Sequence, residues 1–422
     1  MTKEFQALLR LVGAACLGGE INMLPPELDW AGIGKLAKVH NVQTLIGYGL
    51  RINPNTACPN EIRSKIIADM RQAAFSNNAW RTEILHLLKE MRKEGISAVL
   101  IKGYAIADCY SAPDCRLSSD TDLLIDKKDE KRACDFLSAK GFHIDKRWAH
   151  GHHSVCTHPT LGCVELHVKL YDEIVEDVWF DKMHIADYLA EPYLYIETDE
   201  GTYLTLGHTD HLLFLVLHLI KHFILSGMTI QLMTDVALYY KKYSAQIDLK
   251  RFWNTIRKLQ YDKLLNTILW AMIGYFGFCR CDFPGIASEM PEHIDAVLAD
   301  LEEGGWMGQA ETEARKNGWM EYNRLRMMRE KSRFHYWTYM LNWKLGQYLH
   351  ALFPALSSLG RKYPYVLKKP WLYPLAWFQR LTLHATRAVF GDSSSAHIAA
   401  NENDICEVSR KRLSLFKKLN ML

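Results

Sequence analysis

The sequence lacks the signatures of several common classes of protein. Its ten cysteines include no C-x-x-C pair, and the closest two are Cys279 and Cys281. This spacing fits neither a zinc site nor the disulfide framework of a small secreted domain, so a reducing cytoplasm is the expected setting. The longest apolar run, from His211 to Leu225, contains histidines and a lysine and is too short and too polar to span a bilayer. We expect no transmembrane segment.

A large excess of charge of one sign is also absent. The formal net charge is +3 over 422 residues, whereas nucleic-acid-binding proteins usually carry a strongly basic domain or stripe. Nucleic acid is therefore not an expected partner. The chain contains 49% hydrophobic residues and no internal repeat. Its length and composition allow a sizeable core divided among two or three domains.

The hydrophobic pattern predicts four regions along the chain. Residues 1–92 and 205–350 show helical periodicity, whereas residues 93–204 mix short apolar runs with amphipathic segments. Residues 351–422 are rich in proline and aromatic residues and end in a helix expected from 403 to 422. In the middle region, strands are expected at 96–101, 120–125, from 142, at 152–157 and at 163–170, with helices after the first two. This order predicts an α+β protein: a small mixed β-sheet core flanked by N-terminal helices and a larger C-terminal helical domain.

The most informative segment is Arg116-Leu-Ser-Ser-Asp120-Thr-Asp122-Leu-Leu-Ile125. If its apolar end is a strand, the period of two places Asp120 and Asp122 on the same face. Two neighbouring carboxylates repel each other unless a divalent cation lies between them, so the pair indicates a Mg²⁺ site. The alternative is that the two residues cap a helix and line a loop.

A second segment, from Cys163 to Leu170, supplies a third acid. Apolar and polar residues alternate along it, which predicts a half-buried strand with Glu165, His167 and Lys169 on its polar face. On its own, Glu165 would be interpreted as a solvated side chain. In sequence with the two aspartates, it completes the three acidic groups of a site for two metal ions.

Taken in order, these segments resemble a known family. The strand, the Lys102-Gly103 turn, the helix, the R-x-x-S-D-x-D-L-L-I strand and the E-L-H strand are similar to the uncharacterised nucleotidyltransferase family of bacteria. That family is a branch of the DNA polymerase beta-like nucleotidyltransferase superfamily. The likeness runs from about Trp30 to Gln260 and includes a downstream Asp235. In the superfamily a Gly-Gly or Gly-Ser turn precedes the D-x-D strand, and the Lys-Gly turn found here suits this branch.

The resemblance implies Mg²⁺-dependent transfer of a nucleoside monophosphate from a nucleoside triphosphate, such as ATP, to a hydroxyl or phosphate acceptor, with release of pyrophosphate. The implied catalytic residues, which would also hold two Mg²⁺ ions, are Asp120, Asp122 and Glu165. The third of these would face the attacking group. The implied nucleotide-binding residues are Lys102, Gly103, Arg116, His167, His218 and His222.

Several of these nucleotide-binding assignments have structural alternatives. Gly103 would let backbone amides approach phosphate oxygens at the start of a helix, and Lys102 and Arg116 would balance phosphate charge. The two cations could equally form surface or structural ion pairs. His167 could lie beside the metal ions or form structural hydrogen bonds.

Two other functions stay open. One is a non-catalytic protein that keeps the fold and binds nucleotide. The other is a zinc hydrolase, because His218 and His222 are four residues apart on one helical face. The segment lacks the glutamate of H-E-x-x-H and has Lys221 beside the histidines, so packing or contact with nucleotide or acceptor is the preferred interpretation. Asp235 could orient one histidine, cap a helix or form a salt bridge.

The acceptor is not encoded in any recognisable motif. Because no basic stripe accompanies the core, we expect a small molecule, a sugar or a protein side chain rather than a polynucleotide. Residues 361–422 contain eleven Lys or Arg and four Asp or Glu, a net charge of +7. This tail could contact a membrane surface or an acidic partner, or it could pack on its own protein.

Overall fold

The computed structural model describes most of the chain as far as residue 304. The described residues are 1–145, 153–170, 189–304 (without 22–23, 200 and 226), 363, 365, 369–379 and 411–421. The chain divides into two units, Met1–Thr312 with Ser414–Met421, and Glu313–Leu413 with Leu422. All the predicted site residues belong to the first unit. None of the described helices is long and apolar enough to cross a membrane.

Most of the predicted C-terminal tail lies outside the described residues. In the second unit, a short 3-10 helix, η7 (Pro370–Leu372), leads into helical residues 373–379. Of the helix predicted from 403 to 422, residues 411–418 are described and are helical. Their apolar side chains Leu415 and Phe416 are buried, and the Phe416 ring packs edge-on against Phe223, with 5.4 Å between the ring centroids. This part of the tail therefore packs on its own protein.

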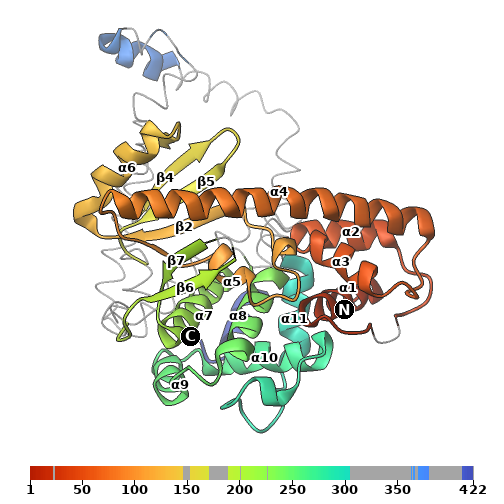
Figure 1. The fold of residues 1–422 in the computed structure, drawn as a ribbon. Coiled ribbons are helices and arrows are strands. Elements are labelled where there is room, and N and C mark those ends of the chain that lie inside the picture. Colours follow the sequence, from red (N-terminus) through yellow and green to blue (C-terminus); the bar gives the residue numbers. More distant parts are fainter. Residues whose placement is uncertain are drawn as a thin grey trace. The chain divides into compact units, whose positions relative to one another are not determined.

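Four helices form the N-terminal region. They are α1 (Lys3–Leu17), α2 (Trp30–Val39), α3 (Gln43–Ile52) and α4 (Asn60–Lys93). In Figure 1, α4 extends from the other three helices across the sheet. Its apolar residues from Ile84 to Met91 are buried in the core beneath the sheet, and the left-handed Gly95 (φ 71°) follows its end. A single helix thus connects the helical region with the core.

A seven-stranded mixed sheet forms the centre of the first unit. Its strands are β1 (Ala98–Leu100), β2 (Asp120–Ile125), β3 (His143–Asp145), β4 (His153–His158), β5 (Gly162–His167), β6 (Leu194–Thr198) and β7 (Gly201–Thr205). Their order is β3-β4-β5-β2-β1-β7-β6. The pairs β2 with β5 and β1 with β7 are parallel, and the other pairs are antiparallel. Between strands lie α5 (Tyr104–Ala107), η1 (Pro113–Cys115), η2 (Lys127–Asp129) and α6 (Glu130–Ala139).

The two faces of this sheet differ in character. Leu123 and Ile125 of β2 and Val164 and Leu166 of β5 point into an apolar core closed by α4 and α6. Because side chains alternate along a strand, the residues between them point to the opposite face. The register aligns Asp122 with Glu165 and Leu124 with His167. The acidic residues therefore share one face, opposite the core.

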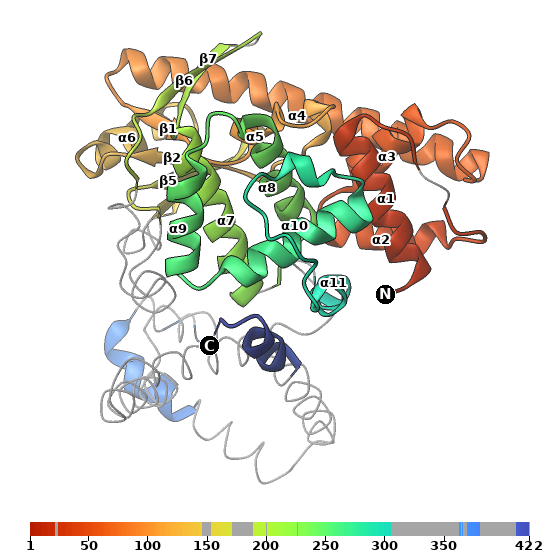
Figure 2. The same ribbon diagram turned by 90° about the horizontal axis from the view of Figure 1, so that it is seen from below.

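The second half of the first unit is helical. Its elements are α7 (His208–Leu225), α8 (Ile230–Tyr243), α9 (Leu249–Lys258), α10 (Asp262–Phe276), η6 (Arg280–Asp282) and α11 (Ile294–Gly304). Figure 2 shows the sheet between α4 on one side and α7 on the other. A Cβ on Gly13 would lie 1.9 Å from the Phe276 carbonyl oxygen, so glycine allows α1 and α10 to approach closely. The structure confirms the predicted α+β class, in which helical regions precede and follow the β-sheet core along the chain.

Candidate active site

Three ligand-type side chains meet on the acidic face of the sheet. His167 Nε2 lies 3.0 Å from Asp122 Oδ1 and 3.4 Å from Glu165 Oε2. One ligand atom from each residue lies within 4.8 Å of the others, a spacing that could hold a metal ion. The parallel pairing of β2 with β5 produces this arrangement, because it aligns Asp122 with Glu165. Metal ligation by Asp122 and Glu165 stays a prediction, but the predicted acids of the two strands are brought together.

Lys102, which follows β1, lies between the two aspartates. Its Nζ is 2.9 Å from Asp122 Oδ2 and 3.3 Å from Asp120 Oδ2. Burial opposes the charge of Lys102, but the two carboxylates outweigh this effect and raise the pKa of the ammonium group. Burial also opposes the charge of Asp122, yet Lys102 and His167 hold its pKa well below the usual value. The space between the aspartates therefore already stabilises a cation. We call Lys102, Asp120, Asp122, Glu165 and His167 the acidic cluster.

Gly103 makes the turn that places Lys102. Its φ is +67°, and a Cβ at this position would lie 2.8 Å from Ser118 Oγ, so a larger residue would strain the turn. The helix predicted after the turn is short, because α5 extends only from Tyr104 to Ala107. A single helical turn carries a small dipole. Glycine is needed at position 103 because of the conformation of the turn, and the dipole of α5 adds little.

Arg116 lies in a separate, buried ion pair. Its Nη2 is 2.7 Å from Asp235 Oδ2 and its Nε is 3.1 Å from Asp235 Oδ1. Tyr110 Oη donates a further hydrogen bond to Asp235 Oδ1 at 2.6 Å. The Arg116 and Asp235 side chains are each 3% exposed. Of the two alternatives for Arg116, the structure therefore places it in the structural ion pair, and Asp235 forms the salt bridge considered for it.

The backbone that leads into β2 is held by side chains of three helices. We call residues 114–117 the anchored loop, because each of its four carbonyl oxygens accepts a hydrogen bond from a side chain. The donors are Asn77 to Asp114 (3.0 Å), Thr44 to Cys115 (2.6 Å), Asn77 to Arg116 (3.1 Å) and Gln231 to Leu117 (2.8 Å). Asn41 in turn donates to Gln231 Oε1 at 2.7 Å. These contacts fix the start of the strand that carries the two aspartates.

Sequence reasoning did not identify the residues that hold the anchored loop. Asn77, Thr44 and Gln231 come from α4, α3 and α8, far apart in the chain, and no local spacing connects them. The one available signal is that Gln231 and Asp235 are four residues apart, which places both on one face of α8.

His218 and His222 of α7 are close to each other but are not part of the acidic cluster. Their ring centroids are 4.6 Å apart. Burial, followed by the nearby charge of Lys102, lowers the pKa of both, to about 3 for His222. Both are therefore neutral at pH 7. Among the described residues, the group spaced for a metal ion does not include either histidine.

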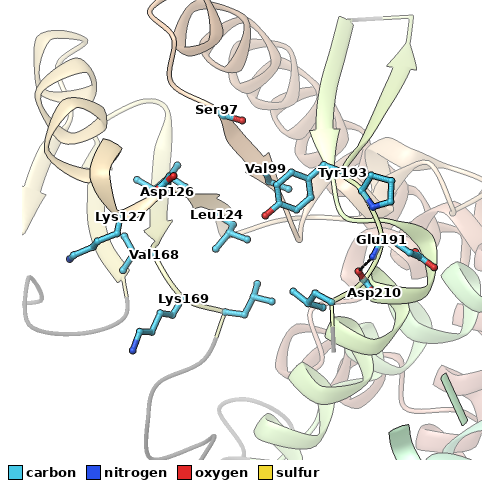
Figure 3. Close-up of a pocket in the computed structure, with 14 residues that line it drawn as sticks. Ser97, Val99, Leu124, Asp126, Lys127, Val168, Lys169, Glu191, Tyr193 and Asp210 are labelled. Carbon is cyan, nitrogen blue, oxygen red and sulfur yellow. Dashed lines mark hydrogen bonds between the residues drawn. The ribbon is translucent and has the colours of Figure 1, made fainter. Parts of the chain in front are cut away.

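A cavity opens along the same face of the sheet (Figure 3). Its volume is about 910 Å³, and Leu124, the next residue after Asp122 on this face of β2, lines it. Tyr193 and Val99 also line it, and the Glu191 N–H donates to Asp210 Oδ2 at 2.9 Å on its far side. Leu170 and Leu189, which flank the undescribed segment 171–188, are further lining residues. A cavity of this size can accommodate a small organic molecule.

Comparison with known proteins agrees with this geometry. Residues 26–277 match a protein family described as an uncharacterised nucleotidyltransferase. The match includes the whole sheet, the acidic cluster and the anchored loop, and it spans more than half of the 422 residues. No curated protein and no solved structure matches the chain. The resemblance inferred from the motifs is confirmed, and the chain belongs to the uncharacterised nucleotidyltransferase family.

Proposed function

We propose that this protein is a divalent-metal-dependent nucleotidyltransferase that moves a nucleoside monophosphate from a nucleoside triphosphate to a hydroxyl or phosphate acceptor, releasing pyrophosphate. The observation that carries the proposal is the acidic cluster. Asp120, Asp122 and Glu165 supply three carboxylates on one sheet face, and the Lys102 ammonium group contacts the two aspartates. This excess of acid, in a chain of this family, supports a site for added cations.

In the proposal, Asp120, Asp122 and Glu165 hold two Mg²⁺ ions. Bound divalent ions supply charge neutralisation of the triphosphate and stabilisation of the leaving pyrophosphate. The residues fit such ions, because the position between the aspartates already holds the Lys102 ammonium group within 3.3 Å of both carboxylates. Carboxylate oxygens are the ligands that Mg²⁺ prefers.

The chain's own residues have distinct roles in this proposal. Lys102 can exchange a carboxylate for a phosphate oxygen, because its ammonium group stays charged at all physiological pH values. Glu165, whose side chain is 25% exposed, can accept the proton of an acceptor hydroxyl. Arg116 acts through position, since its pairing with Asp235 holds the anchored loop and so orients β2. Positioning and electrostatics would supply most of the rate.

The acceptor in this proposal is a small molecule, a sugar or a protein side chain. The cavity beside Leu124 supports this class, because it begins where the acidic face ends and has room for a small organic molecule. We also propose a cytoplasmic location. All nine cysteines among the described residues are free, which agrees with a reducing compartment.

The test is release of pyrophosphate by the purified protein with each nucleoside triphosphate in the presence of Mg²⁺. We expect the double variant Asp120→Ala plus Asp122→Ala to lower the rate by about three orders of magnitude, since metal ions supply several kcal/mol of stabilisation. Asp135→Ala, an exposed residue of α6, is the matched control and should leave the rate unchanged. Equal rates in the double variant and the wild type would reject the site. Calorimetry that detects nucleotide binding without turnover would identify a non-catalytic binding protein.

A further inference from the structure

His167 contributes a ring nitrogen to the acidic cluster. It lies two residues after Glu165 on β5, so both side chains emerge from the same face of one strand. Its side chain is 9% exposed. The same nitrogen, Nε2, faces both carboxylates, at 3.0 Å from Asp122 Oδ1 and 3.4 Å from Glu165 Oε2. One nitrogen and two oxygens from three side chains thus lie within 4.8 Å of one another.

These separations match the edges of a metal coordination sphere. Two ligands that each lie about 2.1 Å from an ion, at a right angle to each other, are about 3.0 Å apart. The distance between His167 Nε2 and Asp122 Oδ1 is 3.0 Å, and the distance to Glu165 Oε2 is 0.4 Å longer, at 3.4 Å. Among the described residues, Asp120 is not a member of this group of three ligands. It contacts Lys102 instead.

We propose that His167 Nε2 is a direct ligand of the metal ion held by Asp122 and Glu165, and that this position selects a divalent transition ion over Mg²⁺. The inference rests on the proposed function and replaces Mg²⁺ with a transition ion at one of its two metal positions. Imidazole nitrogen suits transition metals, whereas Mg²⁺ prefers oxygen ligands and water. At the other position, which the Lys102 ammonium group occupies in this structure, the possible ligands from Asp120 and Asp122 are carboxylate oxygens, which suit Mg²⁺. The two positions thus differ in ligand chemistry.

The rival interpretation is that His167 donates a hydrogen bond to the carboxylates and never bonds to metal. Both interpretations place the ring beside the ion. They differ in whether a nitrogen is directly attached to it, and electron spin-echo spectroscopy of bound Mn²⁺ measures this difference. The imidazole of histidine can be separated from the amine of Lys102, because the second ring nitrogen adds its own modulation.

The experiment uses the full-length protein with less than one equivalent of Mn²⁺. We expect imidazole modulation in the wild type and Mn²⁺ affinity about tenfold higher than Mg²⁺ affinity in competition. In His167→Gln the modulation should vanish and the preference for Mn²⁺ should fall. His86→Gln is the matched control, because His86 lies on α4 with a side chain 63% exposed. This control should keep both properties.

The wild-type spectrum decides the question even if His167→Gln fails to fold. Bound Mn²⁺ that shows no imidazole modulation, and whose binding is lost in Asp122→Asn, would overturn the inference and leave the proposed function intact with an all-oxygen site. Imidazole modulation that persists unchanged in a folded His167→Gln would also overturn it. Imidazole modulation in a protein that releases no pyrophosphate from any nucleoside triphosphate would support the inference while the proposed function fails.

Discussion

Two buried contacts between a cation and carboxylates lie at either end of the segment from 116 to 122, and they differ in charge balance. Arg116 and Asp235 form a one-to-one pair with two short contacts, and Tyr110 supplies a further hydrogen bond. In the acidic cluster, a single ammonium group is shared by Asp120 and Asp122, and Glu165 lies nearby. The first contact is balanced, because one cation meets one carboxylate. The acidic cluster contains three carboxylates and one ammonium group.

This difference distinguishes a structural contact from a functional one. A balanced buried pair with satisfied hydrogen bonds gains nothing from a further ion, and breaking it leaves a buried charge alone. Neighbouring carboxylates in excess over cations repel each other, and an added cation relieves this repulsion. The side chains also differ in access. Those of Arg116 and Asp235 are 3% exposed, whereas those of Asp120 and Glu165 are 27% and 25% exposed.

The largest stability effect is expected from breaking the balanced pair. Asp235→Asn keeps the shape of the side chain but leaves the Arg116 guanidinium buried without its countercharge. We expect a loss of about 3–5 kcal/mol in the free energy of unfolding. Urea denaturation at pH 7 measures this loss.

The control for this experiment removes both charges. Arg116→Met combined with Asp235→Leu should cost less than the single variant, because no charge is left unpaired. A double variant as unstable as Asp235→Asn would show that the pair is not the balanced contact described here. Addition of Mg²⁺ or Mn²⁺ should not rescue Asp235→Asn.

Removing the cation of the unbalanced cluster should give a smaller loss that metal ions reverse. In Lys102→Met, Asp120 and Asp122 lose their shared ammonium group, and we expect a loss of about 2 kcal/mol without divalent ions, since the site is partly exposed. Millimolar Mg²⁺ should restore most of this stability, as followed by urea denaturation. If Mg²⁺ left the stability of Lys102→Met unchanged and instead restored that of Asp235→Asn, the roles assigned to the two contacts would be contradicted.

The comparison extends to His40, whose buried ring should be neutral. His40 is fully buried, and neither ring nitrogen has a hydrogen-bond partner among the described residues. Burial lowers its pKa to about 4. His40 in the unfolded chain has a pKa of about 6.5 and binds a proton below that pH, whereas His40 in the folded chain stays neutral until about pH 4. The free energy of unfolding therefore falls as pH falls from 6.5 towards 4.

The expected effect of His40 can be measured. At pH 5, this group should lower the free energy of unfolding by about 2 kcal/mol relative to pH 7. We expect His40→Leu to remove this part of the pH dependence, so that the difference between variant and wild type grows in favour of the variant as pH falls. Parallel pH profiles for the two proteins would mean that the pKa of His40 is the same in the folded and the unfolded state.

The smallest effect concerns the anchored loop. Thr44 and Thr121 are both buried, but Thr44 Oγ1 donates to the Cys115 carbonyl at 2.6 Å, whereas Thr121 Oγ1 has no hydrogen-bond partner among the described residues. We expect Thr44→Val to cost about 1 kcal/mol and Thr121→Val to cost nothing or to stabilise slightly. Thermal unfolding of both variants checks this. Equal losses would show that the hydrogen bond to the loop has no measurable value.

The central acids were predictable because the signal is local. The period of two places Asp120 with Asp122 and Glu165 with His167, and short apolar runs of β-branched residues mark the strands. The α+β class follows from the same alternation of strands and helices, and the structure confirms it. Even so, the sequence did not show that β2 and β5 are adjacent and parallel in the sheet. Pairing between strands is set by the packing of the whole core.

Arg116 shows where local reasoning ends. It precedes Asp120 by four residues in the most informative segment, yet its partner Asp235 is 119 residues away on α8. The spacing of residues in the segment does not indicate that Arg116 pairs with a residue of α8. It also does not indicate that Asp120 and Asp122 contact Lys102. The donors to the anchored loop are similarly non-local. Such contacts depend on how helices pack, which a residue pattern within one segment does not encode.

The most direct test of the comparison is a titration with Mn²⁺, followed by the electron paramagnetic resonance signal of the free ion. We expect the wild type and the control Asp135→Ala, which changes an exposed residue of α6, to bind Mn²⁺ equally. We expect Asp122→Asn, confirmed as folded by circular dichroism, to lose this binding. Binding in Asp122→Asn equal to that of the wild type would contradict the assignment of the acidic cluster as the metal site of this nucleotidyltransferase.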